Sequence, residues 1–144
     1  MMQATPFLWI KNTSEAIEFY KKAFNAVEKY RLTEPGGKVA HAEIKIGGAK
    51  ISLAGEYPEY DILGPETLGN TTVGIHLQVD DADQLFHQAI ASGATVVNPL
   101  TNQFYGDRAG SVKDPFGHYW MISTTVEIVD PEEMQKRFLA MFTN

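Results

Sequence analysis

Two segments, Thr5-Pro6-Phe7-Leu8-Trp9-Ile10 and Gly74-Ile75-His76-Leu77-Gln78-Val79, share one pattern of side chains and end at residues 10 and 79, 69 residues apart. Each alternates in the way that a half-buried β-strand does. The same offset places Asn12-Thr13-Ser14-Glu15 on Asp81-Ala82-Asp83-Gln84, and both of these sequences are typical of helix N-termini. The chain therefore contains one structural unit twice, and this repeat decides the fold.

Each copy of the repeat reads as a strand, a helix and three further strands, with glycine-rich and proline-rich turns between the strands. The predicted fold class is α+β, with two tandem βαβββ modules that form a concave cup, followed by a C-terminal amphipathic helix. We expect a single domain over 1–144. Its parts are a first module at 5–55, a linker at 56–70, a second module at 71–126 and the C-terminal helix at 130–143.

The composition excludes several classes of protein. The chain has 144 residues, with 12 Lys and Arg against 18 Asp and Glu, and a formal net charge of −6. This balance argues against binding to nucleic acid or to an anionic membrane. There is no cysteine, which rules out disulfides and thiolate chemistry. The sequence shows no secretory signal and no apolar run long enough to span a membrane, so we expect a soluble cytoplasmic protein.

Alternation along the strands predicts which side chains lie on the sheet face that the helices leave uncovered. In the third strand Ala40, Ala42 and Ile44 alternate with Val39, His41 and Glu43, and the second set should face the cup. The same parity assigns further residues to this face: Phe7, Trp9, Ser52, Ala54, His76, Gln78, Tyr119, Met121 and Ser123. The predicted surface combines aromatic rings with a few polar groups, as small-molecule pockets do.

The motifs of the second half resemble those of a known superfamily. These motifs are His76-Leu77-Gln78-Val79-Asp80-Asp81, Tyr105-Gly106-Asp107-Arg108 and Asp114-Pro115-Phe116-Gly117-His118-Tyr119-Trp120, and Ala16-Ile17-Glu18-Phe19-Tyr20 adds to them in the first half. Together with the paired modules they resemble the glyoxalase/bleomycin-resistance/dioxygenase (vicinal oxygen chelate) superfamily, and within it the PhnB-like branch. The superfamily includes isomerases, dioxygenases, transferases and drug-sequestering binding proteins, so the resemblance implies the fold more firmly than the function.

The resemblance also implies where a divalent metal would be held, on the first and last strand of each module. Those positions fall on Thr5, Ser52, Gly74 and Met121 in this sequence. Two hydroxyls, a missing side chain and a thioether do not form a tight site for a hard or borderline cation. We therefore expect no metal and no other cofactor.

Other residues could still support chemistry. His41, Glu43 and His76 are candidates for a displaced metal site or for a base and its orienting partner, although histidines in hydrogen-bonded walls are more common than catalytic ones. Arg108 could bind a ligand carboxylate or phosphate, or pair with Asp107. The full set predicted to contact a ligand is Phe7, Trp9, His41, Glu43, Ser52, His76, Gln78, Tyr105, Arg108, Tyr119 and Met121.

Two functions from different classes follow. The first is a metal-free binding protein of the bleomycin-resistance type, whose aromatic cup holds a flat or amphipathic small molecule. The second is a metal-dependent lyase or isomerase that uses a non-standard site. The exposed face of each module and the apolar stripe Met134, Phe138, Met141 and Phe142 also predict a homodimer, formed by module pairing across chains or through the C-terminal helix.

Overall fold

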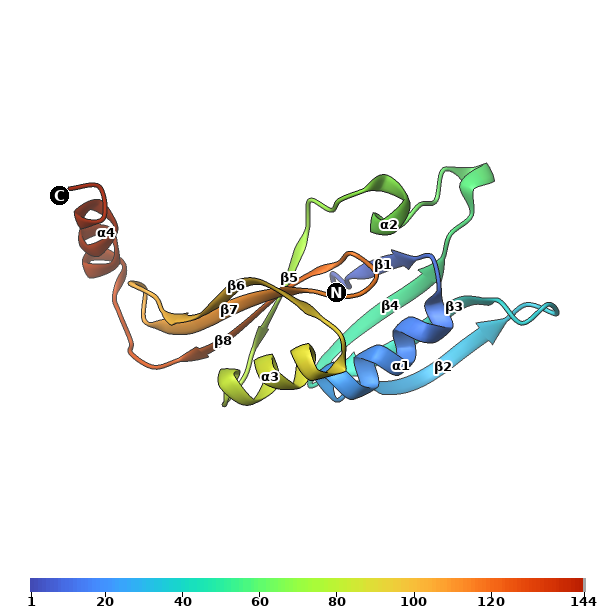
Figure 1. The fold of residues 1–144 in the computed structure, drawn as a ribbon, viewed down its shortest axis with the longest axis horizontal. Coiled ribbons are helices and arrows are strands. Elements are labelled where there is room, and N and C mark those ends of the chain that lie inside the picture. Colours follow the sequence, from blue (N-terminus) through green and yellow to red (C-terminus); the bar gives the residue numbers. More distant parts are fainter. Residues whose placement is uncertain (144) are drawn as a thin grey trace.

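The protein is described by a computed structural model that covers residues 1–143. Two copies of a strand, a helix and three strands follow each other, with a linker between them and a helix at the end (Figure 1). The elements of the first copy are β1 Phe7–Ile10, α1 Thr13–Phe24, β2 Val27–Thr33, β3 Val39–Ile46 and β4 Ala49–Gly55. The linker contains the 3-10 turn η1 Pro58–Tyr60 and the short helix α2 Pro65–Leu68. The remaining elements are β5 Gly74–Gln78, α3 Ala82–Ser92, β6 Thr95–Asn102, β7 Asp107–Lys113, β8 Tyr119–Thr125 and α4 Pro131–Ala140.

Each copy forms a four-stranded sheet, with the order β1-β4-β3-β2 in the first and β5-β8-β7-β6 in the second. The first strand of each copy pairs in parallel with the last, and the other pairs are antiparallel. The predicted α+β fold of two βαβββ modules and a C-terminal helix is confirmed. The parallel pair requires a crossover, and the helix of each module supplies it.

The local signals in the sequence set the helix boundaries. Asn12 and Asp81 cap α1 and α3, and their side chains accept hydrogen bonds from the backbone N–H groups of Glu15 and Gln84. Gly93 ends α3 at a φ of 123°, which a residue with a side chain rarely adopts. The apolar face of α1 is buried against its sheet through Ala16, Ile17, Tyr20, Ala23 and Phe24.

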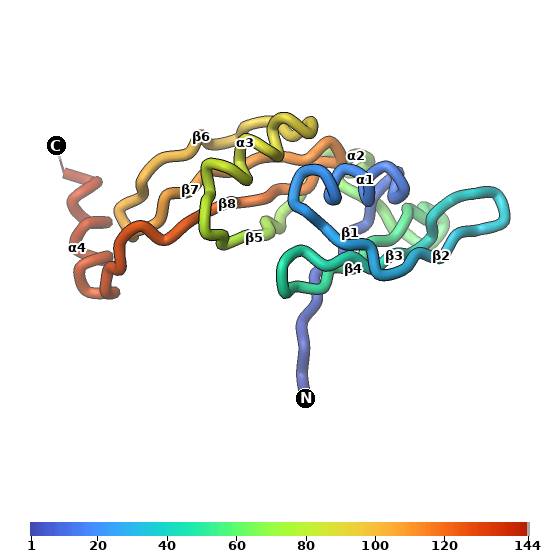
Figure 2. The backbone as a smooth tube through the Cα atoms, turned by 90° about the horizontal axis from the view of Figure 1, so that it is seen from below, coloured from blue at the N-terminus to red at the C-terminus, as the bar shows by residue number. Residues whose placement is uncertain are grey.

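The two modules share one core. Helices α1 and α3 lie side by side on the same side of the molecule (Figure 2). Trp120 of the second module packs against Tyr20 and Phe24 of the first, with ring centroids 5.3 and 4.6 Å apart. The Tyr20 hydroxyl and the Trp120 indole Nε1 both donate to Asp114, at 2.6 and 2.8 Å. Buried aromatic packing and one shared carboxylate therefore hold the modules together.

The strand alternation predicted from the sequence is correct for β1, where Leu8 and Ile10 are buried while Phe7 and Trp9 are exposed. It is wrong at the start of β3. There Val39 is 5% exposed and is part of the core, rather than on the open face. The pairing of β2 with β3 shifts register between Leu32 and Thr33. A bulge of this kind reverses the side to which the following residue points, and strand alternation cannot reveal it.

Helix α4 extends from one end of the molecule, away from β1 and α2 (Figure 1). Asp130 caps it, and Arg137 fastens it by donating to both carboxylate oxygens of Glu127, at 2.8 and 3.0 Å, and to the carbonyl of Phe104. None of its residues is buried. Among the described residues, no helix is long and apolar enough to cross a membrane.

Candidate functional site

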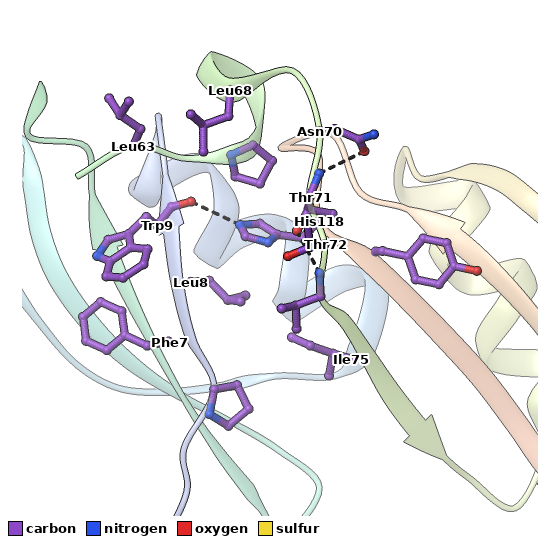
Figure 3. A pocket seen from close by; sticks show the side chains of 14 residues that line it. Phe7, Leu8, Trp9, Leu63, Leu68, Asn70, Thr71, Thr72, Ile75 and His118 are labelled. Carbon is purple, nitrogen blue, oxygen red and sulfur yellow. Dashed lines mark hydrogen bonds between the residues drawn. The ribbon is translucent and has the colours of Figure 1, made fainter. Parts of the chain in front are cut away.

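A large cavity lies between the two modules, where the edge strands β1 and β5 diverge beneath the linker (Figure 3). Its volume is about 520 Å³, within the range of small-molecule sites. Apolar and aromatic side chains from β1, the linker and β5 predominate, with a few hydroxyl, amide and imidazole groups among them. The lining residues are Pro6, Phe7, Leu8, Trp9, Leu63, Pro65, Leu68, Asn70, Thr71, Thr72, Val73, Ile75, His118 and Tyr119.

A buried carboxylate holds the linker over this cavity. Glu56 accepts hydrogen bonds from the Gly64 backbone N–H at 2.6 Å and from the Thr67 hydroxyl at 2.9 Å. Burial by itself would raise the pKa of Glu56, but these two hydrogen bonds and nearby lysines outweigh it, so the pKa lies below its ordinary value. A Cβ atom on Gly64 would come within 2.6 Å of the Trp9 carbonyl oxygen, so the linker contacts β1 at a position that only glycine fits.

His118 connects the second module to the cavity wall. Its Nε2 lies 3.1 Å from the backbone oxygen of Trp9, and Figure 3 shows this bond between Trp9 and His118 beside Leu8. The imidazole is buried in the turn that precedes β8. This contact fixes β1 to the second module.

The open face of the first sheet carries a run of rings. The ring centroid of Phe7 lies 5.3 Å from that of Trp9 and 5.8 Å from that of His41. The Tyr30 hydroxyl forms a hydrogen bond with His41 Nε2 at 3.1 Å. Phe7 and Trp9 remain 45% and 43% exposed while they line the cavity. Aromatic surface at this exposure is available to a ligand or to another protein.

Phe7, Ser52 and Glu43 lie side by side on the same face of the sheet. Ser52 of β4 is the cross-strand partner of Phe7 in β1 and of Glu43 in β3. The Glu43 carboxylate is half-buried, and Lys50 approaches it only to 3.9 Å. Neither Glu43 nor Ser52 lines the large cavity.

On the open face of the second sheet the polar residues pair with hydroxyl groups. His76 Nε2 is hydrogen-bonded to Ser123 Oγ at 2.6 Å, and Gln78 donates to the Thr125 hydroxyl at 2.6 Å. His76 is thus bonded within its own sheet, as His41 is within the first.

A second cavity of about 460 Å³ lies on this face, and Tyr105, Tyr119 and Met121 contribute to its lining. Burial, and the charge of Asp107 beside it, raise the pKa of Tyr105 above its ordinary value. Tyr119 lines both cavities, so the two are neighbours.

Arg108 projects to the helix side of the second sheet and donates to both carboxylate oxygens of Asp83, at 2.8 and 3.0 Å. The Arg108 guanidinium lowers the pKa of Asp83, mainly through these hydrogen bonds. Its hydrogen-bond partners are Asp83 of α3 and, at 3.2 Å, Asn102 of β6, and they do not include Asp107, the partner that the sequence offered.

The positions at which the family's metal ligands would stand do not fit a metal. Thr5, Ser52, Gly74 and Met121 supply no imidazole and no carboxylate. Among residues 1–143, no three His, Asp or Glu side chains lie close enough together to hold a cation elsewhere. His41, Glu43 and His76 are therefore not grouped as the ligands of one cation.

Sequence reasoning missed the linker residues. Leu63, Pro65, Leu68 and Asn70 line the cavity, yet the segment carries no helical or strand periodicity that would mark them. The one feature of the sequence that could have indicated them is the presence of two leucines in a segment otherwise rich in proline, glycine and acidic residues. Whether such residues face a cavity depends on contacts with β1 that alternation does not encode.

Two βαβββ modules with a shared core and a ligand-sized cavity between them define a class of paired-module proteins, within which enzymes and binding proteins both occur. A family model described as "Glyoxalase/Bleomycin resistance protein/Dioxygenase superfamily" matches residues 3–122. The chain therefore belongs to this superfamily, as the sequence motifs had indicated.

Relatives and structural neighbours agree with this assignment. An uncharacterized protein of Mycobacterium bovis is 42% identical over 134 residues, which cover 91% of this chain and 88% of the relative. The PhnB protein from Bacillus cereus superimposes with a TM-score of 0.66 at 20% identity, covering 85% of this chain and 99% of that one. The fosfomycin resistance protein FosX from Listeria monocytogenes gives 0.66 at 19% identity, covering 93% and 98%. Both structures share the fold.

Proposed function

We propose that this protein binds an apolar or amphipathic small molecule in the cavity between β1, β5 and the linker. The observation that supports this most directly is the cavity itself, of about 520 Å³, with two partly exposed aromatic side chains, Phe7 and Trp9, in its wall. A ligand stacked on these rings would remove them from water, which stabilises a complex by roughly 25 cal/mol per Å² of apolar surface. Of the residues predicted from the sequence to contact a ligand, Phe7, Trp9 and Tyr119 line this cavity.

Binding without a metal fits the chain better than the superfamily's metal chemistry. The donor set at Thr5, Ser52, Gly74 and Met121 does not suit Mg²⁺, Mn²⁺, Ni²⁺ or Zn²⁺. A lyase or isomerase reaction on a displaced metal is the second candidate. It would need His41, Glu43 and His76 to hold one cation together, and no group of three His, Asp or Glu side chains among residues 1–143 is placed to do so. We further propose that the protein acts in the cytoplasm, as a homodimer, and without nucleic acid or membrane partners.

A thermal-shift screen tests the proposal, because a ligand that binds only the folded state raises the melting temperature. We expect planar apolar compounds to stabilise the protein, and Ni²⁺, Zn²⁺, Mn²⁺ and Mg²⁺ to leave it unchanged. Trp9→Ala should abolish most of the ligand-induced shift while lowering the melting temperature of the free protein only slightly, since Trp9 is already 43% exposed.

Val126→Ala, at an exposed position outside both cavities, is the control and should respond to ligands like the wild type. One equivalent of tightly held divalent metal in the purified protein would instead support the lyase or isomerase.

A further inference from the structure

The hydrogen bond between His118 and Trp9 determines which ring nitrogen of His118 carries a proton. Nε2 of His118 lies 3.1 Å from the backbone oxygen of Trp9. Because a carbonyl oxygen can only accept, Nε2 must carry a proton and donate it. In the neutral imidazole Nδ1 then has a lone pair and acts as an acceptor. The contact with Trp9 therefore fixes Nδ1 of His118 as a hydrogen-bond acceptor.

This Nδ1 atom is open to a ligand. Among residues 1–143 no hydrogen bond involves it, and no fully buried side-chain nitrogen or oxygen lacks a partner. Nδ1 therefore keeps some exposed surface, although His118 as a whole is only 8% exposed. His118 lines the large cavity and not the second one, and in Figure 3 its ring lies among the lining side chains beside Leu8. The acceptor is thus reached from the large cavity.

The position of this acceptor is fixed by the turn that carries it. The His118 backbone N–H donates to the Asp114 carboxylate at 3.0 Å, and the His118 carbonyl accepts from the Asp114 N–H at 2.9 Å. The bond from Nε2 to Trp9 holds the far end of the ring. A group that is already held in place loses little freedom when a ligand binds to it. His118 is therefore a preorganised acceptor in the cavity wall.

The rest of the wall restricts the ligand to uncharged molecules. Among the described residues that line the cavity, none is Lys, Arg, Asp or Glu, so a charged group would lose its hydration without gaining an ionic partner. The hydroxyl and amide groups of residues 70–72 are at exposed or partly exposed positions. The Tyr119 hydroxyl is hydrogen-bonded to Ser111. His118 is the buried polar side chain of the wall, and a ligand that meets it must bring a donor.

We propose that the ligand of this protein is an uncharged phenol. Its ring lies in the cavity against Phe7 and Trp9, and its hydroxyl donates a hydrogen bond to Nδ1 of His118. An amide or a carboxylic acid would also bring a carbonyl oxygen, to which the apolar neighbours Leu8 and Ile75 cannot donate. One hydroxyl on an aromatic ring supplies the donor without that cost. This inference rests on the proposed small-molecule binding and adds the class of ligand.

Calorimetry with two naphthalene probes tests the ligand class. 2-Naphthol carries the hydroxyl donor, and 2-methoxynaphthalene has the same rings with a methyl group in place of the hydroxyl proton. We expect 2-naphthol to bind about ten-fold more tightly, because the ether leaves Nδ1 without a donor. The ether has the larger apolar surface, so burial alone would favour it instead.

Two substitutions of His118 separate its contact with the ligand from its contact with β1. His118→Gln places an amide N–H near the position of Nε2 and no atom at that of Nδ1, so it should keep the bond to Trp9 and lose the preference for 2-naphthol. His118→Asn places a carbonyl oxygen near the position of Nδ1 and should keep the preference, with a lower melting temperature. A purely structural histidine would instead lose stability and the binding of both probes together. His87→Gln, at an exposed position of α3, is the matched control and should behave like the wild type.

Nitrogen-15 NMR of the histidine rings tests the tautomer without any substitution. His118 should be neutral with its proton on Nε2, and 2-naphthol but not 2-methoxynaphthalene should shift the Nδ1 signal. If His118→Gln does not fold, this spectrum decides the question.

A proton on Nδ1 of His118, or a preference for 2-naphthol that is absent from the wild type or unchanged in His118→Gln, would overturn this inference and leave the proposed function standing. If neither probe binds and the thermal screen also finds no ligand that depends on Trp9, both are overturned.

Discussion

The carboxylate of Asp114 accepts hydrogen bonds from both modules. Besides the Tyr20 hydroxyl and the Trp120 indole, the backbone N–H groups of Phe116 and His118 donate to it, at 2.9 and 3.0 Å. Tyr20 and Trp120 have no exposed surface, so water cannot replace Asp114 as their acceptor. Burial, followed by the charge of Asp114, raises the pKa of Tyr20 well above its ordinary value, so its hydroxyl remains a donor across the physiological range. This one residue satisfies the polar groups of an otherwise aromatic interface.

Asp114→Ala should lower the free energy of unfolding by about 3 kcal/mol or more, because it leaves two fully buried donors without an acceptor, at roughly 1–3 kcal/mol each. Urea unfolding followed by far-UV circular dichroism measures the loss. Asp80→Ala, which removes an exposed carboxylate with no hydrogen bond in the described residues, should stay within about 0.5 kcal/mol of the wild type. Equal effects of the two substitutions would contradict the role assigned to Asp114.

At the scale of elements, the linker acts as part of the site. It is fastened by the hydrogen bonds to Glu56 and by its close approach to β1 at Gly64. Four of the residues that line the cavity, Leu63, Pro65, Leu68 and Asn70, depend on that attachment. A change that moves the linker should therefore alter ligand binding without entering the cavity.

Gly64→Ala places a methyl group 2.6 Å from the Trp9 carbonyl oxygen, and the linker or β1 must shift to avoid it. We expect a loss of about 1–3 kcal/mol in unfolding free energy, together with weaker binding of the compounds found in the thermal-shift screen. Gly48→Ala is the matched control, because a Cβ at Gly48 meets nothing within 4 Å. It should change stability by less than about 1 kcal/mol and leave binding intact.

The sequence reveals those elements that are formed by interactions between residues close together in the chain. The caps at Asn12 and Asp81 and the alternation of β1 are local patterns, and they predict the repeat and its helix starts correctly. The bulge that turns Val39 inward, and the pairing of Arg108 with Asp83 on another element, depend on tertiary contacts. For this reason only part of the candidate site could be predicted. Strand alternation indicates the cavity residues of β1 and β8, but it does not indicate those of the linker.

At the scale of the whole molecule, the distribution of exposed apolar surface is uneven. Phe138 and Leu139 of α4, and Met141 and Phe142 directly after it, are between 42% and 73% exposed. The contacts that α4 makes with the rest of the chain include the hydrogen bonds of Arg137 and the packing of Phe138 on Phe104, with ring centroids 5.7 Å apart. A second apolar surface lies on the open face of the first sheet, at Phe7 and Trp9. Apolar surface of this extent on a small protein is typical of an interface.

We therefore predict a homodimer in solution with more than about 1,000 Å² of total buried area, formed through α4 or through pairing of modules between chains. Sedimentation velocity at micromolar concentration should show a species with twice the monomer mass of 16.0 kDa. A single species with the monomer mass would contradict the prediction.

Phe138→Asp places a charge on the apolar side of α4. If α4 forms the dimer contact, this substitution should shift the monomer–dimer equilibrium toward monomer by ten-fold or more. Gln135→Asp introduces the same side chain at an exposed polar position of α4 and should leave the dimer unchanged. A dimer that survives Phe138→Asp would assign the interface to the open faces of the sheets, where the aromatic wall of one copy would then complete the site of the other.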